Sequence, residues 1–173
     1  SASINNINKQ PIDELSDLLE AKNKSILNNQ DSLLLVSLNR ISDFYFFQKQ
    51  YYTALSYLEI AKEKILHSSP IIDSVTFMWN KHDIAMVEDL MGQHEKSLTK
   101  ILSVHQFAIR HKLKRLEGFS EGEIRTNLIN SNKLKELASF YLIDYPKKFE
   151  ELKNTPDLYY RVKAYISESK GDI

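Results

Sequence analysis

Residues 31–66, DSLLLVSLNRISDFYFFQKQYYTALSYLEIAKEKIL, predict two amphipathic helices joined by a tight turn. In the first half, apolar side chains recur every three or four residues, the spacing that gathers them on one face of a helix. The same spacing returns after the polar triplet at 48–50. The two stripes consist of Leu34, Leu35, Leu38, Ile41 and Tyr45, and of Tyr51, Ala54, Leu55, Leu58, Ala61, Ile65 and Leu66. Each stripe needs a partner, so the two helices are expected to pack antiparallel.

Small residues stand where these two helices should cross. Ala54 and Ala61 lie two helical turns apart, with the larger Leu58 between them. Small side chains let a partner helix approach closely, and the larger one fills the groove between them. We interpret these positions as packing rather than chemistry.

This spacing resembles the tetratricopeptide repeat, a helix pair of about 34 residues. The family's signature positions would be Leu38, Ile41, Ser42, Tyr45, Ala54, Leu58, Ala61 and Leu66. Ser42 replaces the usual glycine and keeps a small residue at the crossing. Leu66 replaces the usual proline, so the second helix is expected to run on to a stop at 68–70. The alternative is another kind of antiparallel helix pair built by the same ridge packing.

The composition favours a folded, charge-balanced, helical chain. Of 173 residues, 42% are hydrophobic, which is enough for a core. Basic and acidic residues number 23 each, so no overall field attracts nucleic acid or anionic membranes. No cysteine is present, which excludes disulfides and thiol chemistry. With four glycines, four prolines and no alternating apolar and polar run, the sequence predicts an all-α fold.

No run approaches the roughly 18 apolar residues that a membrane helix needs. The first ten residues, SASINNINKQ, also lack the basic and apolar regions of a signal peptide. We therefore expect a soluble protein without membrane insertion. The compartment stays open: cytoplasm, or periplasm if a signal has been removed.

We expect a flexible lead-in at 1–10 followed by one helical-repeat domain at 11–173, with its helix pairs stacked as a short, tetratricopeptide-like right-handed superhelix. Within that domain we expect the best repeat at 34–68, a weaker repeat at 72–113, irregular helices at 120–153 and a terminal half-repeat at 156–171. The weaker repeat places Ile84 where Ile41 stood, 43 positions earlier, which is longer than the standard repeat.

Local signals predict where several of these helices begin and end. Pro11 and Pro156 suit first helical positions, residues 28–29 suit a helix end, and Gly92 suits a turn. The basic run HKLKR at 111–115 is expected to close a helix, where positive charge complements the helix dipole. Gly118 is expected to interrupt the helix, and Ser120 with Glu123 is expected to form the capping box of the next helix.

No pattern in the sequence predicts catalysis, a cofactor or a metal. The histidines, which are His67, His82, His94, His105 and His111, show no four-residue pairing for a zinc site. Gly118 and Gly122 lack the Lys-Ser/Thr of a phosphate loop, and no nucleophile elbow occurs. We therefore expect a protein that is not an enzyme.

The resemblance implies a groove lined by the first helix of each repeat, where the family typically holds a peptide or a partner helix. The positions that map to this groove are Asn39, Arg40, Asp43, Phe46, Phe47, Trp79, His82 and Met86. Asn39 and His82 would hydrogen-bond a peptide backbone, and Trp79 and Met86 would take an apolar side chain. An alternative is that Trp79 packs inside the fold. Asp43 would repel a carboxylate, so we do not expect the family's capture of chaperone C-termini.

We expect a peptide- or protein-binding module, resembling the sensing part of tetratricopeptide-containing bacterial transcriptional regulators. The alternative is a structural adaptor in a multiprotein complex. In either case the partner is a protein or peptide, with no direct contact to nucleic acid. Residues 44–57 contain more aromatic side chains than one core face of each helix can bury: Phe44, Tyr45, Phe46, Phe47, Tyr51, Tyr52 and Tyr57. Association between copies of the chain, through these surplus aromatics or the terminal helix, stays open.

Overall fold

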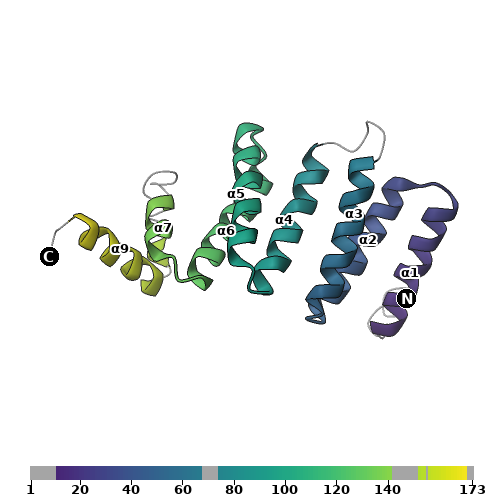
Figure 1. The fold of residues 1–173 in the computed structure, drawn as a ribbon, viewed down its shortest axis with the longest axis horizontal. Coiled ribbons are helices and arrows are strands. Elements are labelled where there is room, and N and C mark those ends of the chain that lie inside the picture. Colours follow the sequence, from purple (N-terminus) through teal and green to yellow (C-terminus); the bar gives the residue numbers. More distant parts are fainter. Residues whose placement is uncertain (1–10, 68–73, 142–151, 155, 171–173) are drawn as a thin grey trace, which may run out of the picture. The chain divides into compact units, whose positions relative to one another are not determined.

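The computed structural model describes residues 11–67, 74–141, 152–154 and 156–170, and their regular structure is helical throughout. The α-helices are α1 (Pro11–Leu27), α2 (Asp31–Phe47), α3 (Tyr51–His67), α4 (Ser74–Leu90), α5 (His94–Arg110), α6 (Lys114–Asn130), α7 (Leu134–Ser139) and α9 (Pro156–Lys170), with a short 3₁₀ helix η2 (Leu152–Asn154). Consecutive helices form adjacent antiparallel pairs (Figure 1). The all-α prediction is confirmed.

The chain divides into two compact units, residues 1–100 and 101–173. Helix α5 begins in the first unit and ends in the second. Each unit is described by itself below. The right-handed superhelix and the single domain over 11–173 stay predictions.

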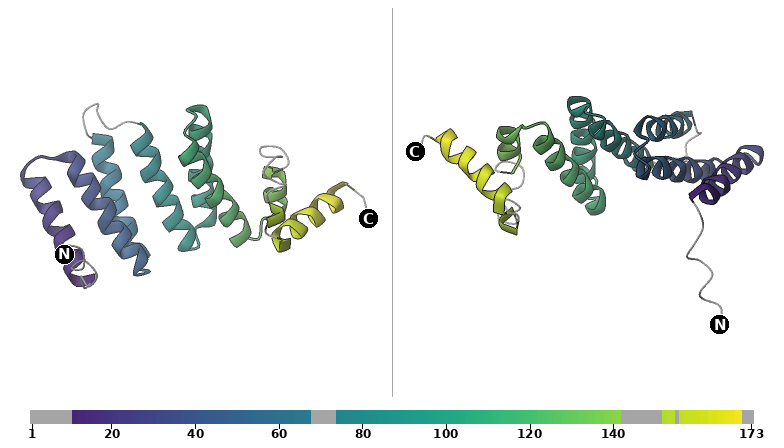
Figure 2. Two further views of the ribbon diagram at one scale, coloured as in Figure 1. Left: turned by 180° about the vertical axis from the view of Figure 1, so that it is seen from behind. Right: turned by 90° about the horizontal axis from the view of Figure 1, so that it is seen from below.

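In the first unit each helix packs against its neighbour in the chain, α1 on α2, α2 on α3 and α3 on α4 (Figures 1 and 2). One buried cluster joins Leu34, Leu35 and Leu38 of α2 to Ala61 and Ile65 of α3. The predicted pairing of the two stripes in 31–66 is therefore confirmed. Burial of these aliphatic side chains is the main stabilising contribution, at about 25 cal/mol per Å² removed from water.

The predicted close approach is also visible between α2 and α3. Ala54 and Ala61 have no exposed surface, and the Ser42 hydroxyl donates a 3.0 Å hydrogen bond to the carbonyl oxygen of Ala54. A side-chain oxygen on one helix reaches a backbone oxygen on the other only when the two backbones lie close. Ser42 is therefore small enough for the crossing and also links α2 to α3 by a hydrogen bond.

Short turns of one geometry connect most of the helices. In each, one residue has a positive φ; these are Asn29, Lys49, Gly92, Lys112 and Asn132. At the α2–α3 turn the Lys49 amide donates to the Phe46 carbonyl and the Gln50 amide to the Tyr45 carbonyl, both at 2.9 Å. This is the Schellman pattern, which satisfies the last carbonyls of a helix. The predicted turns at 48–50 and Gly92, and the predicted helix end at 28–29, are confirmed.

These turns give the described chain a helix-to-helix spacing that the sequence pattern did not reveal. Asn29 and Lys49 are 20 positions apart, and so are Lys112 and Asn132. Helices α2 to α6 each have 17 residues, and the eleventh residue of each is fully or almost fully buried. These residues are Ile41, Ala61, Ile84, Val104 and Ile124. The repeating unit is therefore one helix with its turn, which makes each pair longer than the standard tetratricopeptide repeat.

The predicted break at Gly118 is wrong. Helix α6 runs without interruption from Lys114 to Asn130, and Ser120 is buried inside it. The Ser120 hydroxyl donates to the Leu116 carbonyl at 2.7 Å, so it bonds within its own helix instead of capping. The chain turns earlier, at Lys112, and the basic run 111–115 spans this turn and the start of α6.

In the second unit, α7 packs against both α6 and α9. Leu137 and Tyr141 around α7, and Leu158 and Val162 of α9, are buried. The predicted start of a helix at Pro156 is confirmed. The lead-in at 1–10, the stop at 68–70 and the last residue of the half-repeat at 156–171 lie outside the described residues, as does part of the region 120–153.

Candidate functional site

Three of the eight predicted groove residues line one hollow between α1 and α2. Its volume is about 340 Å³, and its lining consists of Glu14, Arg40, Asp43, Phe44, Phe47 and Gln48. Phe47 is the most prominent of these, because 78% of its surface is exposed. A large aromatic side chain in water loses the free energy that burial would supply. The hollow therefore combines charged groups with an apolar surface left open to solvent.

Asp43 is the electrostatically distinctive group of this hollow. Although the residue is exposed at the surface, partial burial of its carboxylate raises its pKa, and the nearby Asp83 carboxylate of α4 raises it further. Arg40 acts in the opposite direction and does not cancel the two effects. Burial and the Asp83 carboxylate therefore both favour the protonated form of Asp43, and Arg40 favours the charged form.

Asn39 lies one helical turn before Asp43 on α2. Its side-chain oxygen is buried and accepts no hydrogen bond from any residue that the structure describes. A buried acceptor without a donor costs about 1–3 kcal/mol. Asn39 does not line the hollow, so this buried oxygen belongs to the interior of the fold beside it.

The predicted residues of α4 form a second small group. The rings of Trp79 and His82 meet edge to face, with centroids 5.7 Å apart. His82 is 4% exposed, and its Nδ1 lies 3.0 Å from the Asp83 carboxylate. His82 therefore positions Asp83 from within the fold, and the partly buried Trp79 has the larger accessible surface of the two.

Two other predicted groove residues lie only partly exposed. Phe46 packs against the buried cluster of Leu58, Ile84 and Val87, and its ring lies 5.9 Å from that of Tyr51. Met86 on α4 is also half-buried. Phe46 therefore lies at the edge of the core, where packing of α2, α3 and α4 partly buries one of the surplus aromatics.

A buried carboxylate on α4 contrasts with Asp43. Glu88 has no exposed surface, and its two oxygens accept from the ammonium groups of Lys96 at 2.7 Å and Lys100 at 2.7 and 2.9 Å. Next to it, the buried Asp89 carboxylate lies 2.8 Å from Nδ1 of His94. These contacts tie α4 to the beginning of α5 and leave Glu88 well compensated.

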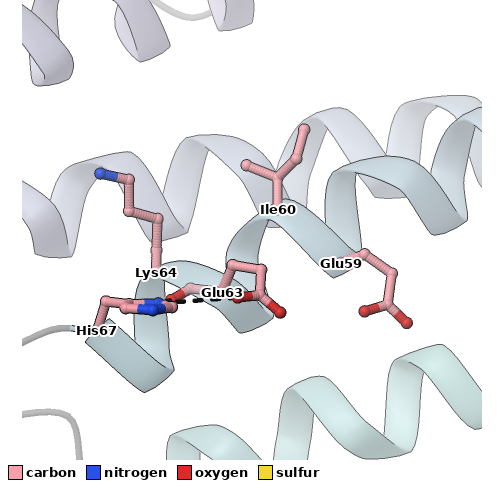
Figure 3. Close-up of a pocket in the computed structure, with 5 residues that line it drawn as sticks. All are labelled: Glu59, Ile60, Glu63, Lys64 and His67. Carbon is pink, nitrogen blue, oxygen red and sulfur yellow. Dashed lines mark hydrogen bonds and ion pairs between the residues drawn. The ribbon is translucent and has the colours of Figure 1, made fainter.

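A larger hollow, of about 450 Å³, lies along α3 (Figure 3). Its lining residues in the described part of the chain are Glu59, Ile60, Glu63, Lys64 and His67. The His67 ring nitrogen Nδ1 lies 2.7 Å from the Glu63 carbonyl oxygen and 3.7 Å from the Glu63 carboxylate. These lining residues come from one helix, whereas the α1–α2 hollow brings two helices and a wider range of chemistry together.

Among the described residues, no group of three or more His, Asp or Glu side chains is arranged to hold a metal ion. The same residues contain no helix long and apolar enough to span a membrane.

Sequence reasoning missed Glu14, Phe44, Gln48 and Asp83. Glu14 belongs to the helix before the best repeat, so its place beside Asp43 depends on the register between α1 and α2. Asp83 carried a signal that was available, because it follows His82 directly and lies one turn after Trp79.

A scan against protein-family models matched no family, and searches of curated proteins and of solved structures gave no match either.

Proposed function

We propose that this chain is a non-enzymatic, peptide-binding module of the tetratricopeptide-like kind, serving as the sensing part of a larger regulator. The observation that supports this most is the α1–α2 hollow, in which the exposed ring of Phe47 lies beside the charged side chains of Arg40 and Asp43. Pockets that recognise ligands combine apolar lining with a few placed polar groups.

The architecture supports the same proposal. Sequential antiparallel helix pairs are the units from which solenoid proteins build extended binding surfaces. Trp79 on α4, which is partly exposed, supplies an aromatic contact. Glu88 and its lysines, in contrast, are engaged within the fold.

The test is selection of peptides from a random display library by the purified chain, followed by affinity measurements with the selected peptides. Phe47→Ala and Trp79→Ala should each weaken binding while the melting temperature changes little. Tyr52→Ala is the matched control, because Tyr52 is 80% exposed on α3 and lies outside the candidate surface. Equal loss of stability and binding in the first two variants would make them core residues, and failure to select any saturable peptide would overturn the proposal.

A further inference from the structure

The α1–α2 hollow has a charge imbalance that points to the chemistry of its ligand. Two carboxylates line it, those of Glu14 and Asp43, and the Asp83 carboxylate acts on Asp43 from α4. Arg40 is the cation among the lining residues. A ligand carrying positive charge would relieve this repulsion, whereas a carboxylate ligand would increase it.

The aromatic residues of the hollow point in the same direction. Phe44 and Phe47 line it together, one partly and one largely exposed. The faces of aromatic rings attract cations, and the planar guanidinium of arginine also stacks on them. Phenylalanine beside carboxylates is therefore a better environment for an arginine side chain than for a neutral polar one.

The third observation concerns the fit of the hollow to a guanidinium group. Guanidinium carries five N–H donors, enough to bond one carboxylate in a bidentate manner and still reach the second carboxylate that lines the hollow. The volume of about 340 Å³ is at the lower end for ligand pockets, which suits one long side chain and not a large ligand.

We propose that the hollow between α1 and α2 receives an arginine side chain of an extended peptide, with Asp43 and Glu14 holding the guanidinium and Phe47 covering its face. This inference rests on the proposed function, because it assigns the ligand chemistry of the same surface. The peptide is the committed partner, and free arginine or a polyamine serves as a comparison in the test.

The test compares fluorescent peptides taken from the library selection that differ at one position: arginine, lysine or citrulline, the neutral analogue of arginine. The arginine peptide should bind at least about tenfold more tightly than the citrulline peptide, the gain expected for one charge-assisted hydrogen bond. The lysine peptide should be intermediate. Added salt should weaken binding of the arginine peptide and leave the affinity of the citrulline peptide nearly unchanged.

Asp43→Asn should remove most of the preference for arginine over citrulline, and Glu14→Gln should reduce it. Glu20→Gln is the control, because Glu20 is an exposed carboxylate on α1 paired with Lys24 and lies outside the hollow. Asp43→Asn keeps the size of the side chain, and a thermal melt of each variant checks that it is folded.

The outcomes separate the two proposals. If peptides bind saturably but arginine and citrulline bind alike, or if Asp43→Asn keeps the preference, the arginine inference is overturned and peptide binding stands. If free arginine amide or a polyamine competes as well as the peptide does, the peptide assignment is overturned. If no peptide binds at all, both proposals fail.

Discussion

Two carboxylates in the first unit, those of Glu88 and Asp43, differ in burial and in the charges around them. Glu88 is fully buried and is neutralised by the ammonium groups of Lys96 and Lys100. Asp43 lies at an exposed hollow, where partial burial of its carboxylate and the Asp83 carboxylate raise its pKa more than Arg40 lowers it. The buried group is compensated inside the fold, and the accessible group is not.

The difference separates structure from function. A buried charge must be paired by its own chain, because an uncompensated one costs several kcal/mol. A surface group without full compensation adds nothing to stability and stays available for a ligand. On this reasoning Glu88 belongs to the framework, and Asp43 belongs to the proposed binding surface.

The largest effect is expected for Glu88→Ala. The change removes the Glu88 carboxylate from the partly buried Lys100 ammonium and opens a cavity, so the free energy of unfolding should fall by about 2–4 kcal/mol. Urea denaturation measures it. The control is Glu20→Ala, which removes an exposed i,i+4 pair with Lys24 and should cost no more than about 0.5 kcal/mol. Equal losses for the two variants would erase the distinction between compensated and solvated carboxylates.

Packing between α2 and α3 should give the next largest effect. Ala54→Leu places three extra carbon atoms where the helices cross and should lower the free energy of unfolding by about 1–3 kcal/mol. Ala21→Leu on the exposed face of α1 is the matched control and should change it little. If the Ala54→Leu variant kept the wild-type melting temperature, the close approach that the Ser42 hydrogen bond indicates would be contradicted.

The turns beside the two carboxylates predict a smaller, reciprocal pair of effects. The α4–α5 turn has Gly92 at φ 78°, and the α2–α3 turn has Lys49 at φ 59°. Because a side chain at positive φ costs about 1–2 kcal/mol, Gly92→Ala should destabilise by about 1 kcal/mol. Lys49→Gly should stabilise by up to about 1 kcal/mol. Thermal melts of both variants measure this, and stabilisation by Gly92→Ala would refute the turn assignment.

The smallest effect, and the most specific to Asp43, is a dependence on pH. A raised folded-state pKa means that the folded chain prefers the protonated carboxyl, so this contribution to stability is present below the ordinary value of 3.8 and lost as pH rises through the raised pKa. Asp43→Asn should therefore melt slightly above the wild type at about pH 7, and the two curves should converge at about pH 3. A variant that melts lower at neutral pH would show that the charge stabilises the fold.

Particular residues show how far the sequence could predict this molecule. The α2–α3 pair and its turn at 48–50 could be predicted from apolar spacing, because a helix that buries one face has apolar residues every three or four positions in its sequence. The turn at Lys112 could not be predicted, since lysine gives no signal for positive φ, and Gly118 misled because glycine is tolerated inside a helix whose other residues pack well.

The candidate site was predicted only in part for a related reason. Arg40, Asp43 and Phe47 lie on one helix and could be grouped by spacing alone. Glu14 and Asp83 join them through the packing of α1 and α4 around α2 and α3, which is tertiary register and leaves no local pattern. The partners of the buried Glu88 were missed likewise, because Lys96 and Lys100 lie beyond a turn.

The most direct test of the account is an NMR titration of the Asp43 carboxyl in the free chain and in the presence of a saturating arginine peptide from the library selection. We expect a pKa above the ordinary aspartate value in the free chain and a clear fall when the guanidinium binds, because a positive charge at the hollow compensates the repulsion from Asp83. An Asp43 pKa that stays the same at saturation would contradict the claim that this carboxylate is held open for a cationic ligand.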